Sequence, residues 1–204
     1  MNKKSFAIIA AVMASAMAQP AEATTRTAIF AGGCFWCMES DFESVTGVTD
    51  VVSGYTGGTM KNPTYRNHEG HLEAVRISYD DTKVTYDQLL HTYWRSIDPT
   101  DPGGQFCDRG HSYTTAIFAL DPGQKQAAEK SKAELEASGK LGAPIVTQIR
   151  DAGFFTEAED YHQDYYKKNP VRYEYYRRGC GRDARIKALW GDEAHAGVTM
   201  HKGS

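Results

Sequence analysis

Residues 32–39 read Gly-Gly-Cys-Phe-Trp-Cys-Met-Glu, and this stretch decides how the chain is expected to fold. Residues 27–31, just before it, are mostly apolar or β-branched and predict a strand. After it, apolar side chains recur at helical spacing, at Phe35, Met38, Phe42 and Val45. The paired glycines therefore predict a strand-to-helix turn that delivers Cys34 to the first turn of a helix.

A cysteine at a helix start is well placed for nucleophilic chemistry. Unpaired backbone N–H groups and the positive end of the helix dipole stabilise a thiolate, so we expect the pKa of Cys34 to fall below its usual value of about 8.5. A buried packing cysteine is the alternative. Because a packing residue needs neither two glycines nor two large aromatic side chains and a second cysteine around it, we interpret Cys34 as a nucleophile.

The first 23 residues resemble an export signal. Two lysines precede an apolar, small-residue run at residues 6–17, and small residues suited to cleavage follow it. Polar residues and a proline from Gln19 onward end the run too early for a membrane anchor. We predict cleavage after residue 18 or 23, a periplasmic or secreted protein, and no stable membrane association.

Residues 24–204 are long enough for one domain with its own core, and we expect a monomer. The net charge is −3 and both signs are interspersed, which argues against a nucleic-acid partner. Four cysteines are too few for a disulfide scaffold in a chain of this size, so we interpret them as chemical groups.

Strands and helices interleave along the domain. Strands are predicted at residues 48–55, 72–79, 113–120 and 145–149, and helices at 85–94, 121–138 and 157–168. Residues 98–110 form a long loop rich in Pro, Gly and Asp, and such loops are usually functional. Since the order lacks the regular repeat of a doubly wound sheet, we predict an α+β two-layer sandwich with an irregular C-terminal tail.

A nucleophilic thiol needs groups that bind the substrate and hold its leaving oxygen. Phe35 and Trp36 directly follow Cys34 and could line an apolar pocket, although Phe35 also fits an ordinary core position. Tyr55 ends a predicted strand beside glycines. Glu73 lies near the start of the next strand, where spacing alone would make it a solvated residue; beside an apolar pocket it would keep its proton and could act as a general acid.

A series of motifs, collinear along nearly the whole mature chain, resembles the methionine sulfoxide reductase A family. They are residues 33–36 with Glu39, 54–58, 63–68 with His71, 73–75, 98–100, 108–110 with Tyr113, 116–118 and 159–163. The resemblance implies a central mixed sheet flanked by helices. It also implies reduction of the S epimer of methionine sulfoxide, free or in proteins, without a cofactor or a metal.

The resemblance assigns roles to individual residues. Cys34 corresponds to the nucleophile that attacks the sulfoxide sulfur and becomes a sulfenic acid. Phe35 and Trp36 correspond to the pocket for the substrate methyl group, and Glu73 to the acid that protonates the sulfoxide oxygen. The acid's hydrogen-bonding partners and a nearby polar residue correspond to Tyr55, Tyr113 and Asp108.

The family usually regenerates its thiol with a resolving cysteine in a C-terminal tail, which a thioredoxin-like reductant then reduces. Cys180, flanked by two glycines, is our first candidate because the glycines would make the tail mobile. Cys37, which stands where many members have glycine, is the alternative. Cys107 in the long loop is the third and least favoured candidate, and its alternative role is structural.

Two functions of other classes compete with this interpretation. Cys34 and Cys37 at a helix start also match a dithiol–disulfide oxidoreductase. With His68 and His71 they could form a metal-binding module, although no second paired motif supports a structural zinc. We prefer the reductase to both.

Overall fold

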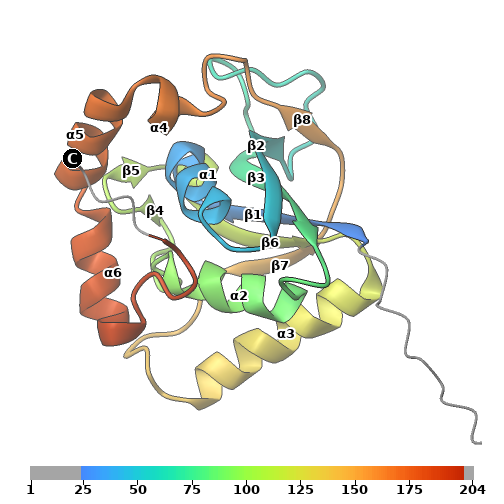
Figure 1. Cartoon of the computed structure of the whole chain (residues 1–204), viewed down its shortest axis with the longest axis vertical. Coiled ribbons are helices and arrows are strands. Elements are labelled where there is room, and N and C mark those ends of the chain that lie inside the picture. Colours follow the sequence, from blue (N-terminus) through green and yellow to red (C-terminus); the bar gives the residue numbers. More distant parts are fainter. Residues whose placement is uncertain (1–23, 200–204) are drawn as a thin grey trace, which may run out of the picture.

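A computed structural model describes residues 24–199, and the predicted export signal at residues 1–23 lies outside them (Figure 1). Six strands form the main sheet in the order β7-β6-β1-β3-β2-β8. Their bounds are β1 Thr25–Gly32, β2 Val48–Thr56, β3 Leu72–Asp80, β6 Thr115–Ala119, β7 Gln148–Asp151 and β8 Phe155–Glu157. Only β6 and β7 pair in parallel, so the sheet is mixed, as predicted.

Three helices connect or cover these strands: α1 Phe35–Glu43, α2 Tyr86–Arg95 and α3 Pro122–Ala137. Thr85 and Gln88 form a reciprocal capping box at the start of α2, and Asp121 accepts a hydrogen bond from the backbone of Gln124 at the start of α3. The sequence predicted both starts. No helix within residues 24–199 combines the length and apolar character that a membrane span requires.

Strand β1 lies in the middle of the sheet and contributes side chains to an apolar cluster on each face of it. Its residues 28–32 are all buried, and successive side chains point to opposite faces. Ala28 and Phe30 enter the larger core cluster with the helices, whereas Ile29 and Ala31 enter a smaller cluster with residues of β3 and β6. The Phe30 ring lies 4.8 Å from that of Tyr93 in α2 and 5.5 Å from that of Phe42 in α1. The helices and the sheet are therefore joined through aromatic packing.

The C-terminal part of the chain is helical, where the sequence analysis expected an irregular tail. It contains α4 Tyr165–Lys168, α5 Pro170–Gly179, α6 Arg182–Trp190 and a 3-10 turn, η2 Gly191–Glu193. Figure 1 shows α5 and α6 along one side of the molecule, next to a small hairpin of β4 Gly104–Gln105 and β5 Asp108–Arg109. Another 3-10 turn, η1 His111–Tyr113, follows that hairpin.

The helix predicted at residues 157–168 forms only at its end, as α4, and the prediction is wrong for residues 157–164. Strand β8 ends at Glu157, and the chain then follows the edge of β2, because the side-chain amide of Gln163 bonds both the N–H and the carbonyl of Ser53 at 2.9 Å. Asp164 adopts a left-handed conformation before α4 begins. Bonds to a strand distant in sequence thus replace the helical bonds that the local pattern favoured.

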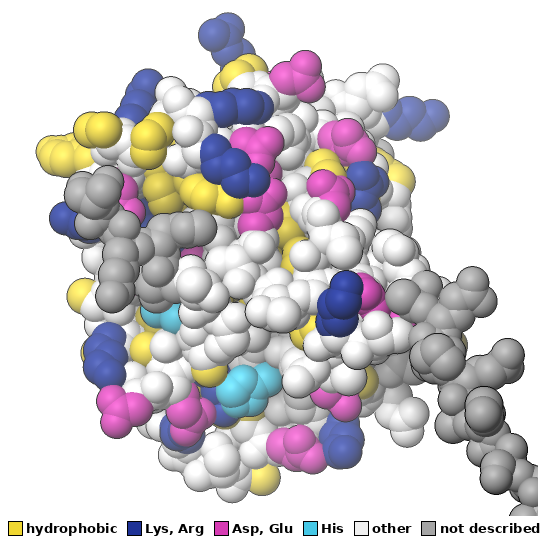
Figure 2. All heavy atoms as spheres, in the orientation of Figure 1, with side chains coloured by type: hydrophobic (Ala, Val, Ile, Leu, Met, Phe, Trp, Pro, Cys, Tyr) yellow, Lys and Arg dark blue, Asp and Glu magenta, His cyan; other side chains and the backbone are white. Residues whose placement is uncertain are grey.

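Charged side chains of both signs are interspersed over the visible face of the molecule (Figure 2). Among the charged groups, Arg177 in α5 is buried: it bonds Asp41 of α1 at 2.7 Å and also Asp183 and the hydroxyl of Tyr173. This ion pair fastens the C-terminal helices to α1. Removing Arg177 would leave the Asp41 carboxylate buried, with the His195 ring 4.0 Å away in place of the guanidinium.

We expect Arg177→Met to lower the free energy of unfolding by about 3–5 kcal/mol, because the buried Asp41 carboxylate loses its guanidinium partner and keeps only the His195 ring, 4.0 Å away, near it. Urea denaturation would measure the loss. Arg178→Met is the matched control, since Arg178 is exposed and pairs only with exposed Glu174, so its cost should stay below about 1 kcal/mol. Equal stability of the two variants would contradict the role of the buried pair.

Candidate functional site

The predicted turn places Cys34 as expected. Gly33 has φ +84°, a conformation that favours glycine, and a Cβ on it would lie 2.6 Å from Gln105. Cys34 is the N-cap of α1, and its carbonyl accepts the N–H groups of Cys37 at 3.2 Å and Met38 at 3.3 Å. The thiol therefore lies at the junction of β1 and α1, in the interior of the protein.

The pKa of Cys34 differs from our prediction. We expected the helix start to lower it, whereas burial raises the pKa of Cys34 well above its usual value, and the neighbouring Cys37 and Glu73 add to the rise. The first N–H of α1, that of Phe35, donates to the Glu73 carboxyl group at 3.0 Å. The first N–H of the helix is therefore bonded to the acid and not to the thiol. The thiol is buried, and the local sequence could not reveal that burial would disfavour its charged form.

Cys34 and Cys37 form a coupled pair of free thiols. Both are buried, and their side chains share a hydrogen bond. This bond lowers the pKa of Cys37 to about 7 against the effect of burial, with help from the positive charges of Arg182 and Arg177. The pair therefore loses its first proton from Cys37 close to neutral pH, and a proton can then pass from the Cys34 thiol to the Cys37 thiolate.

Glu73 has the properties expected of a general acid. Its side chain in β3 is buried, directly across the ladder from Tyr55 in β2. Burial raises the pKa of Glu73 to about 8, against the effect of the Phe35 N–H, so the carboxyl group is protonated at neutral pH. The Phe35 N–H, which bonds this protonated carboxyl group, belongs to the peptide bond that follows Cys34. The acid and the pair of thiols are therefore neighbours.

Aromatic rings surround the cysteine pair. The Trp36 ring stacks on Tyr165 with centroids 3.7 Å apart, and its indole N–H donates to Nδ1 of His162 at 3.0 Å. The Phe35 ring lies 5.8 Å from Tyr55 and 5.0 Å from His162. Residues 159–163 belonged to the motifs that carried the resemblance, but the sequence analysis gave neither His162 nor Tyr165 a role.

The remaining predicted residues come from distant segments. The Tyr55 hydroxyl donates to Glu159 at 3.0 Å. Tyr113, in η1, hydrogen-bonds Tyr65, and burial followed by the charge of Glu73 raises the pKa of Tyr113, so its phenol stays protonated. Burial likewise raises the pKa of Asp108 in β5. All three residues therefore belong to the surroundings of Glu73 and Cys34.

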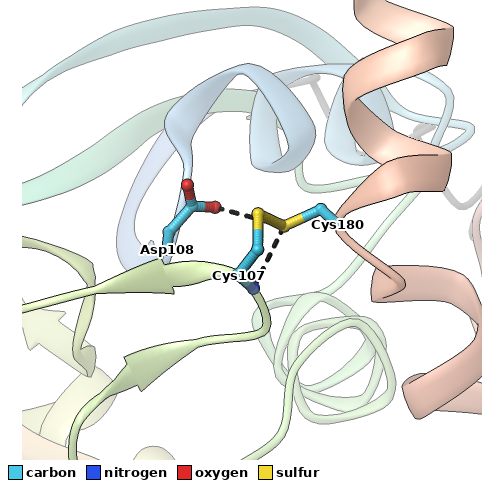
Figure 3. Close-up of side chains that lie close together, drawn as sticks. All are labelled: Cys107, Asp108 and Cys180. Atoms are coloured by element: carbon cyan, nitrogen blue, oxygen red, sulfur yellow. Dashed lines mark hydrogen bonds between the residues drawn. A yellow bond between two sulfur atoms is a disulfide. The ribbon is translucent and has the colours of Figure 1, made fainter.

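Cys180 is not the free thiol that we expected. It forms a disulfide with Cys107, 73 residues away, with Cα atoms 4.9 Å apart (Figure 3). Its flanking glycines do not form a mobile tail either: Gly179 ends α5, and Gly181 turns the chain with φ +71° into α6. In this state of the protein, Cys34 and Cys37 are the free cysteines among residues 24–199.

Within the described range, two clusters bring possible metal ligands close together, and neither contains the alternative set of Cys34, Cys37, His68 and His71. One is Cys107, Asp108 and Cys180, whose sulfur atoms are bonded to each other. The other is Glu39, Glu43 and Asp164, where Lys167 pairs with two of the carboxylates. The ring nitrogens of His68 and His71 contact backbone carbonyls of Thr64 and Met60.

Comparisons with known proteins agree on one family. Residues 26–194 match the family model described as peptide methionine sulfoxide reductase. The peptide methionine sulfoxide reductase MsrA 2 of Rhizobium meliloti is 52% identical over 179 residues, covering 87% of this chain and 89% of that protein. The protein of the same name from Caulobacter vibrioides is 53% identical over 190 residues, covering 91% and 96%.

Solved structures agree. Methionine sulfoxide reductase A of Corynebacterium diphtheriae has a TM-score of 0.64 and 34% identity, covering 72% of this chain and 76% of that one. Reduced Mxr1 of Saccharomyces cerevisiae has a TM-score of 0.66 and 27% identity, covering 72% and 86%. The α+β arrangement predicted from the sequence is thus confirmed.

The raised pKa of Glu73 predicts a pH-dependent stability difference. The folded protein holds this proton up to about pH 8, whereas an ordinary glutamate loses it near 4.5, so the wild type loses stability as the pH rises between these values. Glu73→Gln removes this titration. In urea denaturation, its stability relative to wild type should therefore rise by about 1 kcal/mol per pH unit across that window.

Glu129→Gln, in an exposed part of α3, is the control and should show no such trend. The other buried glutamate with a raised pKa, Glu39, titrates in all three proteins and cancels from the differences. A pH-independent difference between Glu73→Gln and wild type would mean that Glu73 is ionised in the folded protein.

Proposed function

The chain belongs to the peptide methionine sulfoxide reductase family, and we propose that the pocket around Cys34 reduces the S epimer of methionine sulfoxide, free or in proteins. The enzyme is an oxidoreductase, and thiols supply its electrons. The observation that carries the assignment to this pocket is the protonated, buried Glu73 beside the Cys34–Cys37 pair. Sulfoxide reduction needs both an acid for the oxygen and a soft nucleophile for the sulfur.

The proposed reaction follows from these two groups. Glu73 donates its proton to the sulfoxide oxygen, which makes the sulfur electrophilic, and the Cys34 sulfur attacks. Two electrons pass from Cys34 to the substrate, the oxygen stays on Cys34 as a sulfenic acid, and methionine leaves. Burial keeps the phenols of Tyr55 and Tyr113 protonated, and each could donate a hydrogen bond to the oxygen after turning from its present partner, Glu159 for Tyr55 and Tyr65 for Tyr113. Asp108 is a further polar group at this side of the site.

We assign the substrate methyl group to the aromatic wall of Phe35 and Trp36. The hydrogen bond to His162 and the stack on Tyr165 fix the orientation of Trp36, so the wall is rigid before substrate binds. Such an apolar wall beside polar donors distinguishes the methyl group from the oxygen of a sulfoxide. Its geometry provides a physical basis for choosing one epimer.

Regeneration is better assigned to Cys37 than to Cys180, our first candidate from the sequence. Cys37 is free and hydrogen-bonded to Cys34, whereas Cys180 is bonded to Cys107. The Cys37 thiolate would attack the sulfenic sulfur of Cys34, form a Cys34–Cys37 disulfide and release the oxygen as water with a proton taken up. A dithiol then reduces that disulfide.

We propose a thioredoxin-like protein as the dithiol donor. The yeast relative Mxr1 has been solved in complex with Trx2, which illustrates such a partner for that protein. The lysines and apolar run within residues 1–23 support export to the periplasm or beyond, with the enzymatic domain starting near residue 24. We further propose that this domain acts as a monomer. An exported enzyme would need a donor on that side of the membrane.

The assigned pocket should reduce one sulfoxide epimer only, and it should require Cys34. With dithiothreitol as reductant, the enzyme should reduce the S epimer of a methionine sulfoxide peptide and leave the R epimer unchanged. Cys34→Ser should abolish turnover, because no other group can accept the oxygen from the substrate. Chromatography of the product methionine peptide measures both. Reduction of the R epimer, or activity in Cys34→Ser, would refute the assignment.

Glu73→Gln tests the acid. Glutamine keeps the shape and a hydrogen-bond donor but cannot transfer a proton to the oxygen, so methionine release in a single turnover should slow by about 10²–10⁴-fold. Reduction of a preformed enzyme disulfide should change little. The exposed Glu129→Gln variant should match wild type in both measurements. An unchanged single-turnover rate for Glu73→Gln would remove Glu73 from the chemistry.

The resolving cysteine can be identified by counting products. Cys37→Ser should still release about one methionine per enzyme, because only Cys34 is needed for that step, but multiple turnover with a thioredoxin-type donor should fall steeply. Peptide mapping of the wild type after one equivalent of sulfoxide should show a Cys34–Cys37 crosslink. Normal turnover of Cys37→Ser, together with a Cys34–Cys180 crosslink, would restore Cys180 to the role.

A further inference from the structure

Tyr176 of α5 reaches the reacting sulfur, although neither the motifs nor the spacing singled it out. Its hydroxyl hydrogen-bonds the Cys34 thiol, and this bond favours the thiolate. The same hydroxyl donates to Oδ2 of Asp108 at 2.5 Å. Its ring contacts the Trp36 ring edge-on, with centroids 5.8 Å apart. Tyr176 therefore touches the nucleophile, the aromatic wall and the acidic residue of β5.

A phenol has one proton and cannot donate it to two acceptors at once. When Asp108 is ionised, the Tyr176 proton lies toward the carboxylate. When Asp108 is protonated, it can donate to the phenol oxygen, and the Tyr176 proton is then free for the Cys34 sulfur. Burial raises the pKa of Asp108, although Tyr176 and Arg182 oppose the rise, and burial keeps the pKa of Tyr176 far above neutral pH.

The disulfide joins the two segments that carry this hydrogen bond. Cys107 directly precedes Asp108, and Cys180 lies one helical turn beyond Tyr176, to whose carbonyl its N–H donates at 2.8 Å. The backbone N–H of Cys107 lies 3.1 Å from the Cys180 sulfur, and that sulfur lies 3.7 Å from Oδ2 of Asp108 (Figure 3). The crosslink thus holds the β4–β5 hairpin against α5 at the level of the Asp108–Tyr176 pair.

We propose that Tyr176 is a further catalytic residue, which donates a hydrogen bond to the Cys34 thiolate, and that the Cys107–Cys180 disulfide positions it by clamping α5 to β5. The proposal rests on the reductase function assigned to Cys34. A dithiol that reduces this bond gives two electrons and two protons to it, so that Cys107 and Cys180 become thiols and the dithiol becomes a disulfide; the clamp therefore opens under strongly reducing conditions. Sulfoxide reduction then slows without any change in the residues that bind substrate.

Tyr176→Phe removes only the hydroxyl, and its neighbour offers a matched control. Tyr175 lies on the same helix and is 83% exposed, so Tyr175→Phe removes an equivalent hydroxyl away from the site. For Tyr176→Phe we expect methionine release in a single turnover to slow by about 10–100-fold, since a hydrogen bond to a charged group is lost. The pH midpoint for alkylation of Cys34 by iodoacetamide, followed by peptide mapping, should shift upward.

Alkylation measures the Cys34 thiol in the absence of sulfoxide. It therefore separates failure of the Tyr176 proposal from failure of the proposed reductase function. If wild type and Tyr175→Phe reduce sulfoxide equally and Tyr176→Phe does so too, with an unshifted alkylation midpoint, the role of Tyr176 is refuted while the reductase function stands. If wild type reduces no sulfoxide, the proposed function fails, and the alkylation midpoint alone decides whether Tyr176 stabilises the thiolate.

The clamp is tested by Cys107→Ser combined with Cys180→Ser. This double variant should shift the Cys34 alkylation midpoint in the same direction as Tyr176→Phe, and adding Tyr176→Phe to it should change the midpoint and the single-turnover rate little further. Full additivity, or a double variant with wild-type values, would refute the positioning role. If the double variant does not fold, the same comparison can be made on the wild type. The Cys34 alkylation midpoint and the single-turnover rate are then measured with the Cys107–Cys180 bond intact and after dithiothreitol has opened it, with peptide mapping to identify each state.

Discussion

The hydrogen bond from the Phe35 N–H to Glu73 is the constraint on which the site depends. It joins the start of α1 to β3, two elements that are distant in sequence and pack directly against each other. By taking the first free N–H of the helix, the carboxyl group occupies the place where a thiolate would gain most from the helix dipole. The acid and the thiol therefore compete for the same helix N–H. In place of that bond, a hydrogen bond between the Cys34 and Cys37 side chains stabilises a thiolate in the pair.

The C-terminal helices complete the electrostatics of this site. Arg177 and Arg182 supply the positive charges that help lower the pKa of Cys37. Arg182 is buried, donates to the carbonyls of Gly32 and Ser96, and lies over the Phe106 ring of the β4–β5 turn. Since α5 also brings Tyr176 to Cys34, the C-terminal helices are part of the proposed active centre, and their packing energy is linked to the chemistry proposed for the thiols.

Local sequence predicted what depends on neighbours in the chain: the glycine turn before Cys34, the capped starts of α2 and α3, and most strands. It failed where contacts between distant segments decide. Gln163 holds the chain at the edge of β2 where a helix was expected, Cys107 and Cys180 meet across 73 residues, and burial reverses the expected pKa shift of Cys34. Glu73 was found only through the family resemblance, because solvation of a strand residue depends on what packs over it.

The two cysteine pairs differ in what their closure does to the chain. Crosslinking residues 73 apart restricts the unfolded chain strongly, by about 4 kcal/mol in the chain-entropy account, and the native fold gains that amount. A disulfide between Cys34 and Cys37 closes so short a loop that it gains almost nothing in this way. A dithiol donor should therefore reduce the Cys34–Cys37 bond more readily than the Cys107–Cys180 bond, so turnover can proceed at the first pair while the second keeps Tyr176 in place.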